Sequence, residues 1–148
     1  MPTTAAQMQI VGPVLALAAW TLFVWAWMLA TRLPALRAAG VKLGKLKGGT
    51  GRGAEGVVPD RVQWKAHNYN HLHEAPTVFY AVALGLALIG QGHGLNAELA
   101  WLYFVLRVIH SLIQILWNKV IWRLAIYIAS QLVVAALVLR GLLYLLQI

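Results

Sequence analysis

Apolar residues dominate four long stretches of the chain, and shorter polar stretches separate them. The first stretch has no charged side chain before Arg32, and its core, Ile10–Thr31, is long enough to cross about 30 Å of hydrocarbon. We therefore predict an all-α membrane protein with four transmembrane helices in an up-down bundle. The predicted single domain covers residues 1–148, with helices at about 10–33, 63–90, 97–118 and 119–146 and a loop at 34–60.

The composition supports an integral membrane protein. Hydrophobic residues make up 61% of the chain and charged residues 11%, and the mean hydropathy is +0.71. A cleaved signal peptide carries positive charge before its apolar core, whereas Arg32 follows the core here, so we expect an uncleaved span. The chain has no cysteine, and any thiol chemistry must therefore use a thiol that a substrate brings.

The cations indicate the orientation of the helices. Eight of the twelve Lys and Arg residues lie in or beside the loop at 34–60, two flank the turn between the third and fourth helices, and none lies between Ala66 and Leu106. The positive-inside rule then places the first and third loops in the cytoplasm and both termini on the opposite side. Because these cations border a membrane, the net charge of +8 does not indicate a nucleic-acid partner.

The first loop contains a sequence that fits a nucleotide-binding pattern. Residues Gly51–Gly56 match G-x-G-x-x-G, in which glycines let a pyrophosphate approach a helix that follows a strand. No such strand is expected here. A flexible, solvated, cationic loop is therefore the better interpretation of this segment.

Polar residues follow helical spacing within three of the apolar stretches. Polar groups in hydrocarbon are costly, so these stripes must face protein, water or a ligand. They provide the candidate site. On the second helix they are His67, Asn70, His71 and Glu74; on the third, Arg107, His110, Ser111, Gln114 and Asn118; on the fourth, Lys119, Arg123, Tyr127 and Gln131.

Glu74 and Arg107 are predicted to lie at a similar depth near the middle of the membrane, and we predict that they pair. Arg123 has no obvious carboxylate of its own, and an excess of cation in a buried cavity favours an anionic ligand. The alternative is that the polar residues only hydrogen-bond helix to helix.

A metal site is a further alternative for the second helix. His67, His71 and Glu74 share one face, and His110 is available from the third helix. Membrane di-iron enzymes carry several histidine-rich boxes, whereas this chain has five histidines in total. We therefore predict no metal.

Two blocks of sequence resemble the MAPEG family, the membrane-associated proteins in eicosanoid and glutathione metabolism. Lys65-Ala-His67-Asn-Tyr-Asn70-His71-Leu-His-Glu74-Ala-Pro76 is similar to the family's second-helix signature. Arg107-Val-Ile-His110, with Lys119, Arg123 and Tyr127 at their spacing, is similar to the third and fourth helices of the prostaglandin-synthase branch. The resemblance implies a homotrimer with glutathione bound in a cavity that opens to the cytoplasm.

The resemblance also implies roles for individual residues. Arg123 would stabilise a glutathione thiolate, while the residues that bind the tripeptide would include His67, Asn70, His71, Glu74, Arg107, His110, Gln114 and Tyr127. The chain departs from the family pattern at three of these. His67 stands in place of an arginine, His71 in place of an asparagine, and Gln114 in place of a tyrosine.

The leading hypothesis is a glutathione-dependent transferase or peroxidase that acts on a lipophilic electrophile from the bilayer. Its expected partners are the lipid bilayer, a lipophilic small molecule, glutathione as co-substrate, and two further copies of the chain. The alternative is a non-catalytic lipid-binding or structural membrane protein of the same fold. Arg123 and Tyr127 favour the enzyme, and the three departures favour the alternative.

Overall fold

The computed structural model describes residues 4–45, 47–48 and 51–147. Every regular element in these ranges is helical, as predicted. The elements are α1 (Thr4–Gln7), α2 (Val11–Ala38), η1 (Leu43–Lys45), η2 (Gly51–Ala54), α3 (Asp60–Glu74), α4 (Thr77–Leu88), α5 (Leu95–Leu116) and α6 (Val120–Leu145), where η denotes a short 3₁₀ helix.

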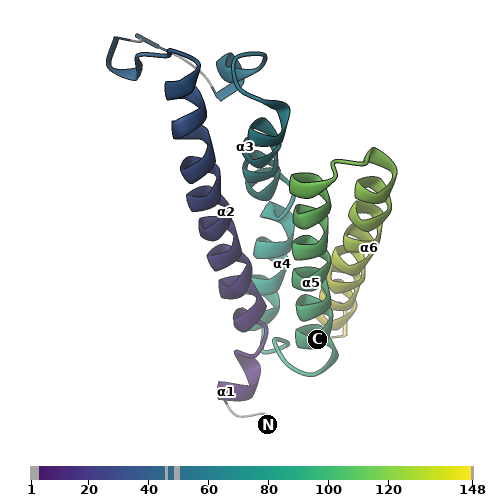
Figure 1. Cartoon of the computed structure of the whole chain (residues 1–148). Coiled ribbons are helices and arrows are strands. Elements are labelled where there is room, and N and C mark those ends of the chain that lie inside the picture. The colour runs from purple at the N-terminus through teal and green to yellow at the C-terminus, as the bar shows by residue number, and fades with distance from the viewer. Residues whose placement is uncertain (1–3, 46, 49–50, 148) are drawn as a thin grey trace.

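The long helices run alongside one another in one bundle (Figure 1). Helix α2 packs against α3 and α4, α5 packs against α2, α3 and α6, and α6 also contacts α4. Figure 1 shows α1 and the last turn of α6 at one end of the bundle, with η1, η2 and the α5–α6 turn at the other. We call the second of these the loop end.

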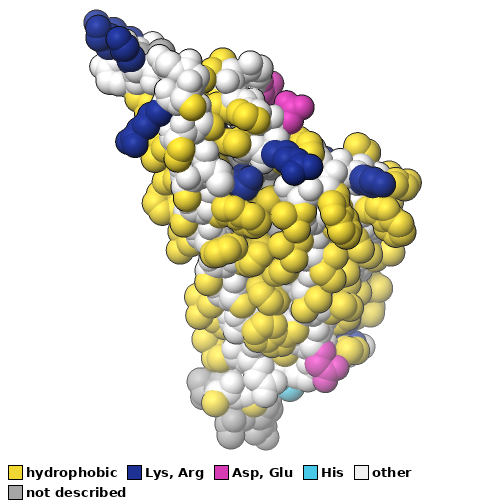
Figure 2. Space-filling model, in the orientation of Figure 1, with side chains coloured by type: hydrophobic (Ala, Val, Ile, Leu, Met, Phe, Trp, Pro, Cys, Tyr) yellow, Lys and Arg dark blue, Asp and Glu magenta, His cyan; other side chains and the backbone are white. Residues whose placement is uncertain are grey.

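Three helices are long and apolar enough to cross a membrane: α2, α5 and α6. Their outer faces are rich in exposed leucine, isoleucine and valine, which suits contact with lipid more than contact with water. Figure 2 shows a largely hydrophobic surface on the lower part of the molecule, with most of the visible Lys and Arg side chains above it, toward the loop end. The chain is an integral membrane protein.

The segment predicted as one helix at 63–90 is divided in the structure. Helix α3 ends at Glu74 and α4 begins at Thr77, with Ala75 and Pro76 between them. Proline has no amide hydrogen to donate to the carbonyl four residues earlier, and its ring crowds that carbonyl. The hydroxyl of Thr77 donates to the Glu74 carbonyl over 2.9 Å and so gives a partner to one of the last carbonyls of α3. The prediction of an unbroken helix was therefore wrong at this point.

The first long helix extends further than predicted. Helix α2 continues through Pro34 to Ala38, whereas the predicted helix ended near residue 33. The described part of the following loop is correspondingly shorter. Lys65 of α3 helps to hold this end of α2, because its ammonium lies 5.5 Å from the centroid of the Trp27 ring.

The apolar core draws residues from all the long helices and includes a stacked aromatic pair between α4 and α5. The rings of Phe79 and Tyr103 stack with centroids 4.2 Å apart, and both side chains are fully buried. Leu17 and Val24 of α2 belong to the same core, as does Leu137 of α6. This packing fixes the helices around the polar residues at the loop end.

The predicted orientation can be tested by labelling, since the chain has no native cysteine. Gly44 lies in η1, where an added side chain meets nothing within 4 Å, and Glu98 is exposed in the first turn of α5. We expect Gly44→Cys to react with an impermeant maleimide only from the cytoplasmic side and Glu98→Cys only from the opposite side. The reverse labelling pattern would refute the orientation.

Candidate functional site

Arg107 is the most deeply buried charge among the described residues and lies within the candidate site. Its side chain is 0% exposed. Its Nε donates to the Tyr103 hydroxyl over 3.0 Å, and its Nη1 donates to Nε2 of His71 over 3.3 Å. The guanidinium carbon also lies 5.2 Å and 5.4 Å from the ring centroids of Tyr103 and Tyr127. These contacts replace part of the hydration that burial removes.

Tyr103 connects Arg107 to the break between α3 and α4. Its hydroxyl accepts from Arg107 and donates to the Ala75 carbonyl, with an oxygen–oxygen distance of 3.5 Å. Arg107 therefore lies one helical turn after Tyr103 on α5, and the ring of Tyr103 stacks on Phe79 of α4. Because Nε2 of His71 accepts from an arginine, the ring of His71 is neutral here, with its proton on Nδ1.

The predicted ion pair between Glu74 and Arg107 is not formed. Arg107 directs two of its nitrogens to Tyr103 and His71, while the exposed Glu74 side chain lines a cavity. The physical reason is the break at Pro76. Glu74 is the last residue of α3, so its side chain lies on the cavity wall instead of reaching across to the buried guanidinium.

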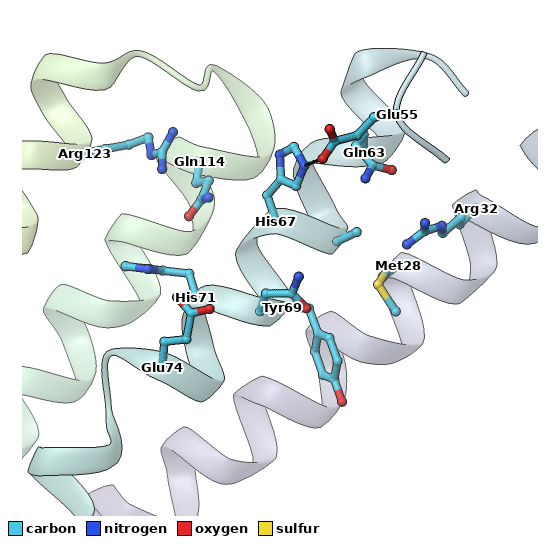
Figure 3. A pocket seen from close by; sticks show the side chains of 12 residues that line it. Met28, Arg32, Glu55, Gln63, His67, Tyr69, His71, Glu74, Gln114 and Arg123 are labelled. Carbon is cyan, nitrogen blue, oxygen red and sulfur yellow. Dashed lines mark hydrogen bonds and ion pairs between the residues drawn. The ribbon is translucent and has the colours of Figure 1, made fainter. Parts of the chain in front are cut away.

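A polar cavity of about 570 Å³ lies at the loop end between α2, α3, α5 and α6. We call it the main cavity. In Figure 3, Arg32 and Arg123 point toward it from opposite sides. Six of the nine predicted site residues line it: His67, Asn70, His71, Glu74, Gln114 and Arg123. The other lining residues are Met28, Arg32, Glu55, Gln63, Ala66 and Tyr69.

The turn between α5 and α6 positions Arg123. Asn118 has a φ of +52°, a left-handed conformation that asparagine tolerates better than most residues, and its amide donates to the Ile113 carbonyl over 2.7 Å. Its side-chain oxygen then accepts from Nη1 of Arg123 over 2.7 Å. Nε of Arg123 is buried, and no described group accepts from it. No carboxylate in the described ranges forms an ion pair with Arg123.

A smaller cavity of about 240 Å³ adjoins the same arginine. We call it the side cavity. The rings of His71 and His110 stack beside it with centroids 4.8 Å apart, and apolar side chains from α6 complete its wall. Its lining residues are His71, His110, Val120, Arg123, Leu124 and Tyr127. His71 and Arg123 therefore line both cavities.

All nine predicted site residues thus lie in one region, but sequence reasoning missed several neighbours. Asn68 is 0% exposed and donates to Gln114 over 3.0 Å, joining α3 to α5. Its spacing with buried Lys65 and Leu72 marks a second face of α3 that the stripe of histidines obscured. Arg32 and Glu55 come from other segments, and local spacing carried no signal for them.

The nucleotide pattern and the alternative metal site can be examined in the described residues. The segment from Gly51 to Ala54 forms a 3₁₀ turn, and no strand precedes it in the described ranges. In those same ranges, no group of three or more histidine and acidic side chains could hold a metal ion.

A model of the MAPEG family matches residues 10–143. The match covers every predicted site residue, three of the four predicted helices in full and the fourth as far as residue 143, so the chain belongs to this family. Searches of curated proteins and of solved structures give no significant match.

The network around Arg107 predicts energetic coupling. Tyr103→Phe removes an acceptor that Arg107 uses, so Tyr103→Phe and Arg107→Leu should be coupled by about 0.5–3 kcal/mol in a double-mutant cycle. Unfolding in mixed detergent micelles would measure it. The matched cycle of Glu74→Gln with Arg107→Leu should give a smaller coupling energy, because these two side chains do not pair. Equal coupling in the two cycles would contradict the structure.

Proposed function

We propose that this MAPEG family member is a glutathione-dependent transferase or peroxidase that acts on a lipophilic electrophile. The observation that carries the proposal is the position of Arg123 at the boundary of two cavities. The main cavity is polar and large enough for a small peptide. The side cavity has apolar walls from α6, which is one of the helices able to span a membrane.

Arg123 is the proposed catalytic residue. The chain has no cysteine, so the nucleophile would be the sulfur of glutathione. A cation beside a thiol favours the thiolate, and each unit by which the pKa of the thiol falls corresponds to about 1.4 kcal/mol. The guanidinium of Arg123, which forms no ion pair with a described carboxylate and has a buried Nε, would supply such a charge.

The remaining predicted residues would bind and orient the tripeptide. Glu74 offers a carboxylate and Gln114 an amide on the wall of the main cavity. Arg107 does not line the main cavity and would act through His71, to which it donates a hydrogen bond. Its Nη2 is buried, and no described group accepts from it. His67, Asn70, His110 and Tyr127 complete the proposed binding set around the two cavities.

The departures at positions 67, 71 and 114 are compatible with this proposal. His71 in place of asparagine accepts a hydrogen bond from Arg107, and Gln114 in place of tyrosine bonds to Asn68. Each substitute is therefore built into the described network. At position 67 an imidazole stands in place of an arginine, and its Nε2 lies 3.2 Å from a carboxylate oxygen of Glu55.

Two reactions would use the same thiolate. In conjugation, the sulfur forms a bond to an electrophilic carbon while the bond to the leaving group breaks and that group departs with the electron pair. In peroxide reduction, the sulfur takes the terminal oxygen and an alcohol leaves; a second glutathione then gives the disulfide and water. A lipophilic substrate would enter from the bilayer, and glutathione would enter from the cytoplasm.

A homotrimer with four spans per chain is part of the proposal. The supporting observation is the exposure of polar side chains in the region where α3 meets α4, where Asn70, His73, Glu74 and Thr77 are all exposed. Polar groups facing lipid are costly, so neighbouring subunits would cover them.

Arg123→Leu should abolish the ultraviolet absorbance of bound thiolate and most conjugation of an aromatic chloride by glutathione. Removing the charge leaves the thiol protonated, while the helices should keep their packing, because the hydrogen bond given for Arg123 goes to Asn118 in the α5–α6 turn and Arg123 is not part of the apolar core. Arg123→Lys should retain part of both signals, since the charge persists without the planar fork.

The matched control is Arg37→Leu, which removes an exposed cation at the end of α2 and should leave activity unchanged. If the wild-type protein shows neither thiolate absorbance at saturating glutathione nor turnover of any electrophile, the enzymatic proposal fails. The lipid-binding or structural alternative would then replace it.

The assembly has its own test. Native mass spectrometry in mild detergent should give a mass of three chains. A mass of one chain under conditions that preserve glutathione binding would refute the trimer.

A further inference from the structure

The end of α2 and the segment after it carry a group of cations that the candidate site does not use. Four of these side chains are exposed: Arg37, Lys42, Lys45 and Lys47. We call these four residues the basic patch. The sequence has no acidic residue between Arg32 and Ala54, and no described carboxylate forms an ion pair with any of the four. Charges of one sign gathered in this way attract a partner that carries several negative groups.

The length of α2 brings the basic patch to the level of the lipid headgroups. Helix α2 has 28 residues and therefore measures about 42 Å, whereas the hydrocarbon core of a bilayer is about 30 Å thick and the whole bilayer about 40–45 Å. The first cation of the helix is Arg32, after the apolar part that crosses the hydrocarbon. Arg37 and η1 follow it and therefore lie in or at the headgroup layer.

The direction of the segment after α2 places it over the lipid beside the bundle. In Figure 1 the dark-blue segment that contains η1 extends from the end of α2 away from α3, α5 and α6. The main cavity lies on the other side of α2, where that helix faces these three. The basic patch is therefore better placed to contact headgroups around α2 than to contact a ligand of the main cavity.

Exposed apolar side chains accompany these cations. Leu43 in η1 is 46% exposed, and Leu33 near the end of α2 is 37% exposed. Leucine next to lysine is typical of segments that lie on a membrane surface, because the leucine contacts the acyl-chain boundary while the lysine reaches the phosphates. This pattern favours a lipid surface over a soluble anion as the partner.

We propose that the basic patch binds anionic lipid headgroups of the adjacent leaflet and thereby holds η1 on the membrane surface. The phosphate oxygens would accept hydrogen bonds from the lysine ammoniums and the Arg37 guanidinium. Because the attraction is ionic and the cations are exposed, salt weakens it. The inference does not depend on whether the protein binds glutathione.

The test uses the full-length protein with Gly44→Cys, which carries an environment-sensitive fluorophore in η1, where an added side chain meets nothing within 4 Å. The protein is reconstituted into vesicles of phosphatidylcholine, with or without phosphatidylglycerol. In the anionic vesicles, quenching by aqueous acrylamide should fall about twofold, and added salt should reverse the fall. Lys42→Gln combined with Lys45→Gln should remove most of the difference between the two kinds of vesicle.

The matched control is Arg61→Gln combined with Lys119→Gln. It removes the same net charge from exposed positions at the loop end and should keep the full difference. Soluble glycerophosphate added to neutral vesicles should not protect the fluorophore, because it is not concentrated at a surface.

Four results would overturn the inference. Equal quenching in both kinds of vesicle would mean that η1 projects into water. Equal loss of the difference in the two double variants would assign the attraction to net charge alone. Protection by glycerophosphate would mean that the patch binds free phosphate, and protection in neutral vesicles that grows with protein density would mean that a second copy of the chain covers η1.

Discussion

The burial of the Arg107 guanidinium is the constraint on which the site depends. An isolated charge in an apolar bundle is unfavourable by several kcal/mol unless polar groups surround it. Here those groups are a phenol, an imidazole and two aromatic faces, none of them a carboxylate. No carboxylate among these contacts offsets the guanidinium charge, and the neighbouring side chains are fixed by the need to satisfy its donors. His71 must be neutral, and Tyr103 must turn its hydroxyl toward the break after α3.

The break at Pro76 determines where the hydroxyl of Tyr103 and the side chain of Glu74 lie relative to Arg107. A continuous helix would leave no carbonyl free at Ala75, and Tyr103 would lose the acceptor for its hydroxyl. In a continuous helix, Glu74 would also be an interior helical residue. In the structure it is the last residue of α3, and its side chain lines the main cavity. One proline thus separates the acidic residue from the buried arginine that it was predicted to neutralise. The cavity retains a carboxylate, and the protein interior retains a cation.

The sequence was sufficient for the helical fold and for most of the site residues. Long apolar stretches identify spanning helices without any knowledge of their partners, and spacing of three and four residues identifies side chains on one face. The histidine stripe of α3 and the arginines at 107 and 123 were found in this way. Pro76 was also visible, but the polar stripe before it and the apolar run after it were interpreted as one span, and residue spacing alone does not distinguish a kinked helix from two helices.

Contacts between distant segments could not be predicted in the same way. Asn68 and Asn70 differ by two positions on one helix, and only the packing of α5 decides which of them meets Gln114. The same holds for Glu55, whose place beside His67 depends on the buried residues on either side of its turn.

These non-local contacts also determine which segments supply the charges that line the main cavity. Helical spacing supplies the positive charge that suits a thiolate, whereas the first loop supplies an opposite charge at the cavity edge. The helices alone bring two guanidiniums, Arg32 and Arg123, and one carboxylate, Glu74, to the main cavity. The acidic turn brings a second carboxylate, Glu55, beside His67 on the cavity edge, so the lining has two guanidiniums and two carboxylates only once the first loop packs against the helices.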